Sequence, residues 1–521
     1  CNIFIYETMA DSINNISLES EKSNIDVIEN KGWHESAYVK WKPFENADSY
    51  NVYYKTSNDS NYSKIDTQLI RRYEEYVIAD VLGIPAGTYT IKIVPVIEGN
   101  EVEAFATETS EVVVDNYVRE GFAFSKNSPY GYTTGAYNKD GSLKENADVI
   151  YITNSNKDSV TVNGDKSLGV GLTEILSKRE SSKSEKPIAI RFLGKVEMPK
   201  DTENYMVAIR TTKNVTVEGV GDDATIHGYG FTAKRACNIE FRNFAIMWYG
   251  GGGDGDSISL DTENKNVWIH NVEFFYGYGK EADQAKGDGS IDLKSKTDYV
   301  TISYCHFWDS GKALVLGGPW EVSNYTKPEA KIYATYHHNW FDHSDSRHPR
   351  CVAGSAHIYN NYYDGVAKYG VGAAVNSSVF VENNYFRNCP RPMLIATQGS
   401  DIYEGGSYKT KGTLSGQDGG MIKEYGNTII GAKRFYTYQT TPDEGQFDAY
   451  SVENRNEKIP DTITALKGGA TYNNFDTDSD IMYEYLVDTP EQAKEKVVNE
   501  AGRRNGGDFK YTFDNDIQDS N

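Results

Sequence analysis

The sequence predicts an all-β protein in which a parallel β-helix follows a small N-terminal β-sandwich. Residues 25–118 alternate apolar and polar side chains in short runs separated by turns, a pattern typical of a small antiparallel sandwich. From about residue 120 onward, Gly and Asn become frequent and one short apolar pattern recurs every 22 to 34 residues. Repeats of this length, with one strand each and no room for a helix, indicate a parallel β-helix. The expected divisions are therefore 1–24 as an N-terminal segment, 25–118 as the sandwich and 119–521 as the β-helix.

Composition excludes several classes of partner. The 521 residues include 53 Lys+Arg and 75 Asp+Glu, a formal net charge of −22, which disfavours a nucleic-acid partner. No stretch approaches the roughly 18 consecutive apolar residues of a membrane span. The five cysteines are widely spread and lack CxxC pairing, so they predict neither a disulfide scaffold nor a zinc site. We expect a monomer.

Both ends of the chain carry local signals. Residue 1 is Cys rather than Met, and CNIFIYETMA is compatible with the tail of a cleaved signal peptide or with a lipidated Cys1. Either interpretation places the protein outside the cell or on its surface. Near the C-terminus, DTPEQAKEKVVNEAG predicts a helix with Asp488 or Thr489 as N-cap, Pro490 at its first position and Gly502 as its stop.

The predicted sandwich resembles a fibronectin type III domain. Its alternating runs are AYVKW, SYNVYYK, EYVIADV, TYTIKIVPVI and TSEVVVD. The resemblance rests on Trp41 in an early strand, Tyr50 and Tyr53 in the next, and Tyr89 at the entry to a later strand. No catalytic cluster falls here, which favours a spacer or docking module over a sugar-binding module.

The repeats of the predicted β-helix have a defined register. Their first apolar positions are Val215, Ile239, Val267, Val300, Ala334, Ala356 and Val379. Each coil would bury this apolar face against its neighbours, and the turn asparagines would satisfy backbone groups between coils, which makes them structural. A helix at 167–178 is expected to cap the amino end, with 187–196 (PIAIRFLGKV) as the first strand.

Charged residues of consecutive coils fall at similar distances before these apolar positions. Asp256 lies 11 residues before Val267, and Asp288 and Asp292 lie 12 and 8 before Val300. Arg347 lies 9 before Ala356.

Lys312 joins this row when residues 317–330 (GGPWEVSNYTKPEA) are treated as an insertion and removed from its coil. Coils are about 4.8 Å apart, so the row would extend about 15 Å and could hold an extended polymer.

The acidic part of this row predicts a cation site. Asp254, Asp256, Asp288 and Asp292 would repel one another unless a cation neutralised them. Oxygen ligands without His or Cys select a hard ion, and the open, loop-borne geometry favours calcium over magnesium. The glycine run around Asp254, taken alone, is equally compatible with a solvated loop.

Several spaced motifs resemble the pectate lyases of polysaccharide lyase family 1. They are DGDSISL, NVWIHNVEF, KGDGSIDLK, YVTISYCHF, GKALVLGG and SRHPR, in this order within residues 120–510. The resemblance implies a right-handed parallel β-helix, polygalacturonate as substrate and calcium as cofactor. It also implies that Asp256, Asp288 and Asp292 are calcium ligands, with Asp254 as an extra ligand.

By the same motifs, Lys312 looks like the family's lysine that binds substrate and takes part in catalysis. Arg347 looks like its catalytic arginine. Arg350 is the second arginine available for a substrate carboxylate. The resemblance would make Arg347 the base that removes the proton beside the uronate carboxylate, so that the glycosidic oxygen leaves. Its alternative role is an ion pair with Asp345 or Asp342.

Two departures from the family pattern lie close to these motifs. His270 and Asn271 stand where the family has Asp and His, which puts local support of the site in question. Val352 stands where the family has a third arginine. His348, beside Arg347, is expected to steer the backbone rather than to titrate.

Three other functions remain open at this stage. A polygalacturonase would share the solenoid and use paired acids without calcium, but the Gly-His-Gly element of those hydrolases is absent. A pectin lyase, which acts on methylated chains, would be expected to replace the second acidic cluster with a basic residue. A non-catalytic pectin-binding surface protein would need neither Arg347 nor Lys312.

Overall fold

The computed structural model describes residues 24–247, 256–275, 289–308, 310–409, 412–414, 416–506 and 519–520. The N-terminal segment with Cys1, and also Asp254 and Asp288, lie outside the described residues. The chain forms two compact units. One comprises Cys1–Val118, Tyr137–Lys144 and Phe513–Asn521, and the other comprises Arg119–Ala136 and Glu145–Thr512.

The first unit is a β-sandwich of two antiparallel sheets. One sheet contains β1 (Val27–Gly32), β2 (Ser36–Trp41), β6 (Val77–Leu82), β5 (Ile70–Arg72) and β39 (Asp519–Ser520). The other contains β10 (Val112–Val114), β7 (Gly87–Ile97), β3 (Ser49–Thr56) and β4 (Ser63–Lys64), with β8 (Asn100–Glu101) and β9 (Thr107–Glu108) also paired to β7. Trp41 of β2 and Tyr50 of β3 meet edge to face with ring centroids 5.1 Å apart, so the core lies between the sheets.

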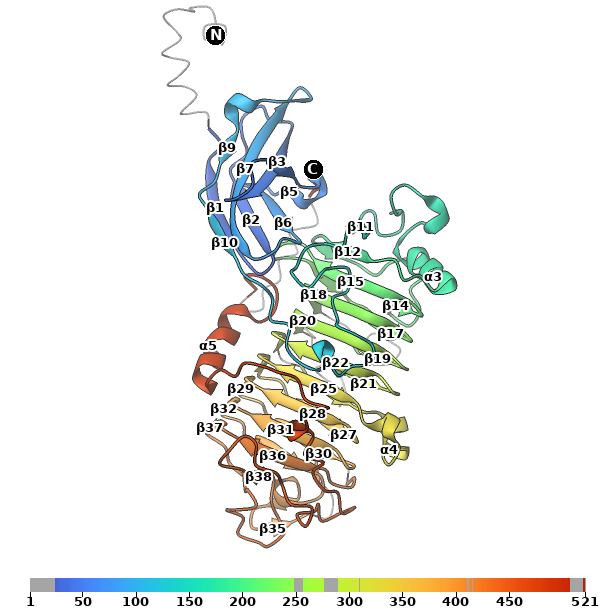
Figure 1. Cartoon of the computed structure of the whole chain (residues 1–521), viewed down its shortest axis with the longest axis vertical. Helices are drawn as coiled ribbons and strands as arrows, with labels where there is room; N and C mark the ends of the chain where they lie inside the picture. Colours follow the sequence, from blue (N-terminus) through green and yellow to red (C-terminus); the bar gives the residue numbers. More distant parts are fainter. Residues whose placement is uncertain are drawn as a thin grey trace, which may run out of the picture. The chain divides into compact units, whose positions relative to one another are not determined.

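The second unit is a parallel β-helix, seen in Figure 1 as strands stacked in successive coils. Within the described residues, its larger sheet has 18 strands. They are β11 (Asp148–Ile152), β12 (Ile188–Phe192), β13 (Lys195–Val196), β15 (Lys213–Gly219), β16 (Thr225–His227), β18 (Cys237–Met247), β20 (Lys265–Phe275), β22 (Asp298–Ser303), β23 (His306–Trp308), β25 (Tyr333–His337), β26 (Trp340–Asp342), β28 (Ser355–Tyr359), β29 (Tyr362–Asp364), β31 (Ser378–Glu382), β32 (Tyr385–Arg387), β36 (Met421–Tyr425), β37 (Thr428–Ile430) and β38 (Tyr450–Ser451).

The register inferred from the sequence repeats is confirmed residue by residue. The paired positions run Val215, Ile239, Val267, Val300, Ala334, Ala356, Val379 and Ile422. All of them are fully buried in one continuous apolar core. Each coil therefore lays one apolar side chain directly on the equivalent side chain of the next coil.

The turn asparagines form a ladder of hydrogen bonds between coils. The backbone N–H of Asn339 donates to the Asn361 side chain at 2.9 Å, and that of Asn361 donates to Asn384 at 2.8 Å. Asn384 continues to Asn427 at 2.8 Å. The ladder satisfies backbone groups at each bend, which supports a structural role for these residues.

A second parallel sheet presents the polar row. Its strands, in order, are β14 (Met206–Arg210), β17 (Gly230–Lys234), β19 (Ile258–Asp261), β21 (Gly289–Lys294), β24 (Lys312–Leu316), β27 (Arg350–Val352), β30 (Val371–Ala374) and β33 (Met393–Ile395). Ile258, Ile291 and Leu314 of adjacent strands face the core. Because side chains alternate along a strand, the intervening residues face outward.

The ends of the β-helix differ in part from the prediction. The strand β12 is not the first one, because β11 precedes it and pairs with it in parallel from Asp148 to Ile152. The N-terminal helix α3 is Leu172–Ser182, later than predicted, and a short 3₁₀ turn at Lys166–Leu168 precedes it.

The predicted C-terminal helix is confirmed as α5 (Pro490–Glu500), which packs on β29 and β32. Its capping box joins Thr489 to Gln492. The inserted segment of the Lys312 coil contains the short helix α4 (Pro319–Ser323). Across the described parts of the chain, no helix has the length and apolar character needed to cross a membrane.

Candidate functional site

The acidic centre of the site lies where β19 and β21 begin. Asp256 is 2% exposed and stands opposite Gly289, because Ser257 N donates to Gly289 O at 3.1 Å. Asp292 is 6% exposed and faces outward between the core residues Ile291 and Leu293. One Asp256 oxygen accepts a hydrogen bond from Gly289 N at 3.1 Å. Gly289 thus lies between the two buried carboxylates.

Lys294 partly balances this charge. Its Nζ lies 3.0 Å from Asp292 Oδ2 and 3.9 Å from Asp256 Oδ2. The other oxygen of Asp292, Oδ1, is buried and has no hydrogen-bond partner among the described residues. A buried carboxylate oxygen without a donor is costly unless a cation or water completes its contacts. Sequence reasoning missed Lys294, although alternation along β21 places it on the same face as Asp292.

Because Gly289 has no side chain, the carboxylates of Asp256 and Asp292 can both lie next to it. A Cβ added there would lie 2.4 Å from Asp292 Oδ1 and 2.9 Å from Asp256 Oδ1, closer than real contacts allow. We therefore expect Gly289→Ala to push the carboxylates apart and to weaken binding of the calcium ion that the sequence predicts here by at least roughly tenfold, about 1.4 kcal/mol. Calcium titration by calorimetry measures this effect. An unchanged affinity, with an unchanged thermal unfolding midpoint as evidence of an intact fold, would contradict it.

The cationic part of the row follows in the next two coils. Gly289 pairs with Lys312, and Lys312 pairs with Ser346. Arg347 comes directly after Ser346, and its carbonyl accepts from Leu314 N at 2.8 Å. Asp256, Lys312 and Arg347 therefore occupy successive positions along one edge of the second sheet. Asp292 lies three residues further along β21, in the ladder that continues through Val315 to Arg350.

The loop that carries Arg347 is held from below by His348. Burial lowers the pKa of His348 to about 4, so the imidazole is neutral near pH 7. Its Nδ1 donates to Tyr369 O at 2.9 Å, and its Nε2 accepts from Ser344 Oγ at 2.6 Å. Arg347 itself has a left-handed backbone, φ 66°, a conformation uncommon for a side-chain-bearing residue. This agrees with the expectation that His348 steers the backbone.

Among the described residues, the side chain of Arg347 has no ion-pair partner. Asp342 pairs instead with His306 and His343, at 2.9 and 2.5 Å. Within the described part of the chain, no ion pair or side-chain hydrogen bond of Arg347 forms, to Asp345 or otherwise. Its half-exposed guanidinium therefore remains available to a ligand.

Arg350 is anchored by a residue that sequence reasoning missed. Its guanidinium donates to Gln417, and burial is the main cause that lowers the pKa of Arg350 from its ordinary value. Gln417 is 67 positions further along the chain and belongs to no repeat, so no local signal pointed to it. Val352 is fully buried in an apolar cluster with Tyr369 and Leu414. At the position of the family's third arginine, this chain therefore has an apolar residue that packs in the interior.

The departure at His270 and Asn271 concerns the larger sheet rather than the site. His270 lies on β20, with its Nε2 2.8 Å from Glu240 and its ring stacked on Trp268 at 3.6 Å. Asn271 donates to Glu500 O at 3.0 Å. Both residues are buried and hydrogen-bonded, so they support this coil by contacts of their own.

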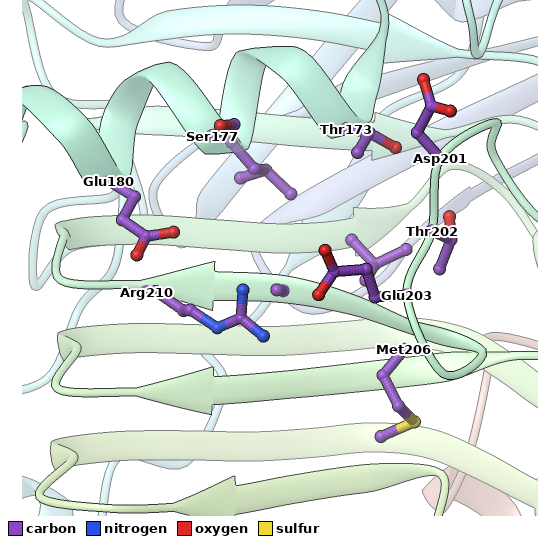
Figure 2. Close-up of a pocket in the computed structure, with 11 residues that line it drawn as sticks. Thr173, Ser177, Glu180, Asp201, Thr202, Glu203, Met206 and Arg210 are labelled. Carbon is purple, nitrogen blue, oxygen red and sulfur yellow. The ribbon is translucent and has the colours of Figure 1, made fainter. Parts of the chain in front are cut away.

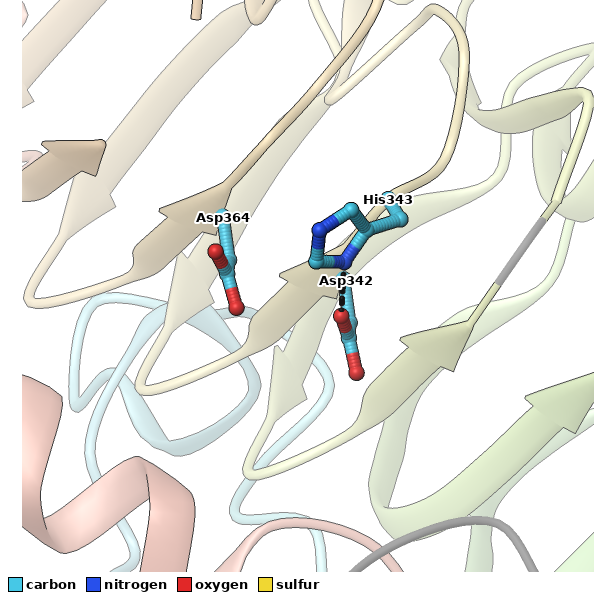
Figure 3. Close-up of side chains that lie close together, drawn as sticks. All are labelled: Asp342, His343 and Asp364. Atoms are coloured by element: carbon cyan, nitrogen blue, oxygen red, sulfur yellow. Dashed lines mark hydrogen bonds and ion pairs between the residues drawn. The ribbon is translucent and has the colours of Figure 1, made fainter. Parts of the chain in front are cut away.

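Two other polar clusters lie away from the row. In Figure 3, Asp342, His343 and Asp364 come together on β26 and β29, with ligand atoms within 4.8 Å of one another. Their carboxylates already have partners, because Asp342 pairs with His306 and His343 and Asp364 pairs with Arg387. The cavity in Figure 2 lies between α3 and β14, and Glu180, Asp201, Glu203 and Arg210 line it.

A protein-family model described as pectate lyase matches residues 123–505, which is more than half of the chain. The chain belongs to the pectate lyase family. Relatives within the family include the pectate trisaccharide-lyase of Bacillus licheniformis, 28% identical over 221 residues, 42% of this chain and 62% of that protein. Pectate lyase B of Dickeya chrysanthemi is 29% identical over 297 residues, 56% of this chain and 68% of that protein. The chain thus spans less than two thirds of the length of the first of these relatives.

The fold agrees with this family. A solved pectate lyase from Bacillus sp. N165, in complex with trigalacturonate, superposes with a TM-score of 0.51 and 22% identity, covering 74% of this chain and 98% of that one. This likeness shows that the second unit has the pectate lyase fold.

Proposed function

We propose that the chain is a calcium-dependent pectate lyase that cleaves α-1,4-linked polygalacturonate by β-elimination. The observation that carries the proposal is a single sheet edge on which two buried carboxylates, Asp256 and Asp292, are followed by Lys312 and Arg347 in the next two coils. Family membership supports the reaction class. The expected products are unsaturated oligogalacturonides.

The acidic centre fits a calcium ion. Asp256 and Asp292 supply only oxygen donors and are both more than nine-tenths buried, and Asp292 Oδ1 has no hydrogen-bond partner among the described residues. Hard cations such as calcium take such ligands. We assign Asp256 and Asp292 as ligands, with Asp254 and Asp288 as further ligands on the evidence of the sequence. When bound, calcium supplies a Lewis acid that spreads the negative charge developing on the substrate carboxylate.

The cationic residues complete the site. Lys312 and Arg350 hold the oxyanions of the substrate, and Gln417 fixes the guanidinium of Arg350 in place. Arg347 takes part as the neutral guanidine, which accepts the proton next to the uronate carboxylate and becomes a guanidinium. The electron pair of that C–H bond forms the new carbon–carbon double bond while the glycosidic oxygen leaves with its own bonding pair. The absence of an ion pair at Arg347 within the described chain supports its role toward the substrate.

Incubation with polygalacturonate provides the decisive test. We expect ultraviolet-absorbing unsaturated products in the presence of calcium and none after a chelator is added. New reducing ends without that absorbance would show hydrolysis and refute the proposal. Products that form at an undiminished rate with chelator present would refute the calcium requirement.

The sandwich unit is proposed to be a fibronectin type III-like spacer. Tyr89 OH donates to Pro85 O, four residues upstream, at 2.7 Å, which is the geometry of a tyrosine corner. The substrate is an extracellular polymer, which supports secretion or attachment to the cell surface.

A further inference from the structure

A cavity rich in cations lies beyond Arg347 along the β-helix. Its lining consists of Ala367, Lys368, Pro390, Arg391, Thr413, Lys433 and Arg434. Four of these residues are cationic and none is acidic, in a chain whose formal net charge is −22. The cavity of Figure 2 is of mixed charge, with Glu180, Asp201 and Glu203 in its lining together with Arg210. We call the four cations Lys368, Arg391, Lys433 and Arg434 the basic groove.

The backbone connects the basic groove to the catalytic row coil by coil. Lys368 N donates to Asp345 O at 2.7 Å, which places Lys368 in the same register as Ser346 and Lys312. His348 N donates to Gly370 O at 2.8 Å, and Gly370 N donates to Arg391 O at 3.0 Å. Two coil spacings therefore separate Lys312 from Lys368, and two separate Arg347 from Arg391, about 10 Å in each case.

The other two residues of the basic groove, Lys433 and Arg434, lie next to the coil of Arg391. The N–H groups of Lys433 and Arg434 both donate to Pro390 O, at 3.0 and 2.9 Å. The side chain of Arg434 donates to Tyr403 O, and its guanidinium lies 5.4 Å from the centre of the Tyr403 ring. Arg434 is thereby held in place while its charge remains uncompensated by a carboxylate among the described residues.

The other three cationic side chains of the basic groove also have no carboxylate partner among the described residues. Lys368 and Lys433 are exposed, Arg391 is half-buried, and none of them forms an ion pair within the described residues. Asp401 contacts Thr413 of the lining, where its buried carboxylate accepts hydrogen bonds from Thr413 N and Oγ1 at 2.8 and 2.7 Å. Like charges gathered without counter-charges favour an anionic ligand.

We infer that the basic groove binds the carboxylates of a polyuronate chain beyond the cleavage site, without calcium. The inference rests on the proposed function, because the same polymer must pass Lys312 and Arg347 first. One polymer chain would then be bound in two different ways along the same sheet edge. Carboxylates of the protein need a cation between themselves and the substrate at Asp256 and Asp292, whereas the basic groove contacts the substrate carboxylates directly.

A triple variant tests the inference, with Lys368→Gln, Arg391→Gln and Lys433→Gln. Its control neutralises three exposed lysines elsewhere, with Lys178→Gln, Lys183→Gln and Lys458→Gln. We expect the triple variant to raise KM for polygalacturonate roughly tenfold and to change kcat less than about twofold, because the groove lies about 10 Å from Lys312 and Arg347 and binds the chain away from the bond that breaks. The control should change neither constant. A fall in kcat with an unchanged KM, or no effect on either constant, would overturn the inference.

A binding measurement separates this inference from the proposed reaction. In an Arg347→Ala background with chelator present, affinity electrophoresis should show that polygalacturonate binds and that the three substitutions weaken binding. Fully methyl-esterified pectin, which is uncharged, should not bind in either case. If the unaltered protein made no unsaturated product but kept this binding, the reaction would be refuted and the groove supported. A single Lys433→Glu variant, at an exposed position, gives a second reading, and unchanged binding by it would count against the groove.

Discussion

Arg347→Ala is expected to lower kcat on polygalacturonate by roughly a thousandfold or more, the range that loss of a positioned general base produces. Fold and calcium affinity should remain unchanged. Arg347 makes no ion pair or side-chain hydrogen bond within the described residues, so its removal leaves no buried group without a partner. Steady-state kinetics, calcium titration and the thermal unfolding midpoint measure the three quantities.

Arg235→Ala is the matched control for this change. Arg235 is an exposed arginine at the end of β17, in the same sheet, and its backbone is also left-handed, with φ 47° against 66° for Arg347. The control should keep the full rate. Near-normal turnover by Arg347→Ala would remove Arg347 from the catalytic role, and an equal loss in both variants would attribute the effect to the backbone rather than to the reaction.

Asp292→Asn is expected to abolish calcium binding at ordinary concentrations and to reduce activity by roughly a hundredfold or more. The substitution replaces a buried charged oxygen donor by a weaker neutral one and leaves Lys294, 3.0 Å from Asp292, without its closer counter-charge. Calcium should raise the thermal unfolding midpoint of the unaltered protein and fail to raise that of the variant, because only a folded state with an intact site gains from the ligand.

Asp261→Asn serves as the control for the charge change. Asp261 faces outward on β19, the strand that Asp256 precedes, and its carboxylate accepts a hydrogen bond from Thr262 Oγ1 at 3.1 Å. Its loss should alter neither calcium affinity nor rate. If Asp292→Asn bound calcium as tightly as the unaltered protein, the ligand assignment would fail.

The sequence was most informative where one physical pattern repeats. A residue such as Val267 must meet Val300 and Ile239 because a coil can bury its apolar face only on the equivalent face of its neighbours. Counting from these positions gave Asp256 and Lys312 similar offsets, and in the structure both lie opposite Gly289 on neighbouring strands. The helix α5 was equally local, since its Thr489 cap and Pro490 start are encoded within a few residues.

Features without a repeat or a local signal were missed. The strand β11 lies far from β12 in sequence, and α3 separates them, so its pairing left no periodic trace. Gln417 reaches Arg350 across 67 residues. Lys433 and Arg434 lie near Arg391 only because a later segment of the chain forms hydrogen bonds with Pro390.

The sequence by itself determined the β-helix, the register of its coils and the charged residues that follow one edge of a sheet, because these depend on side-chain periodicity and on stacking between neighbouring coils. Only the tertiary structure decided how those charges are balanced. It placed Lys294 against Asp292, Gln417 against Arg350 and His348 beneath the Arg347 loop. The physical reason is that electrostatic and hydrogen-bond partners act through space over a few ångströms, and spacing along the chain does not encode those distances when the partners lie on different loops.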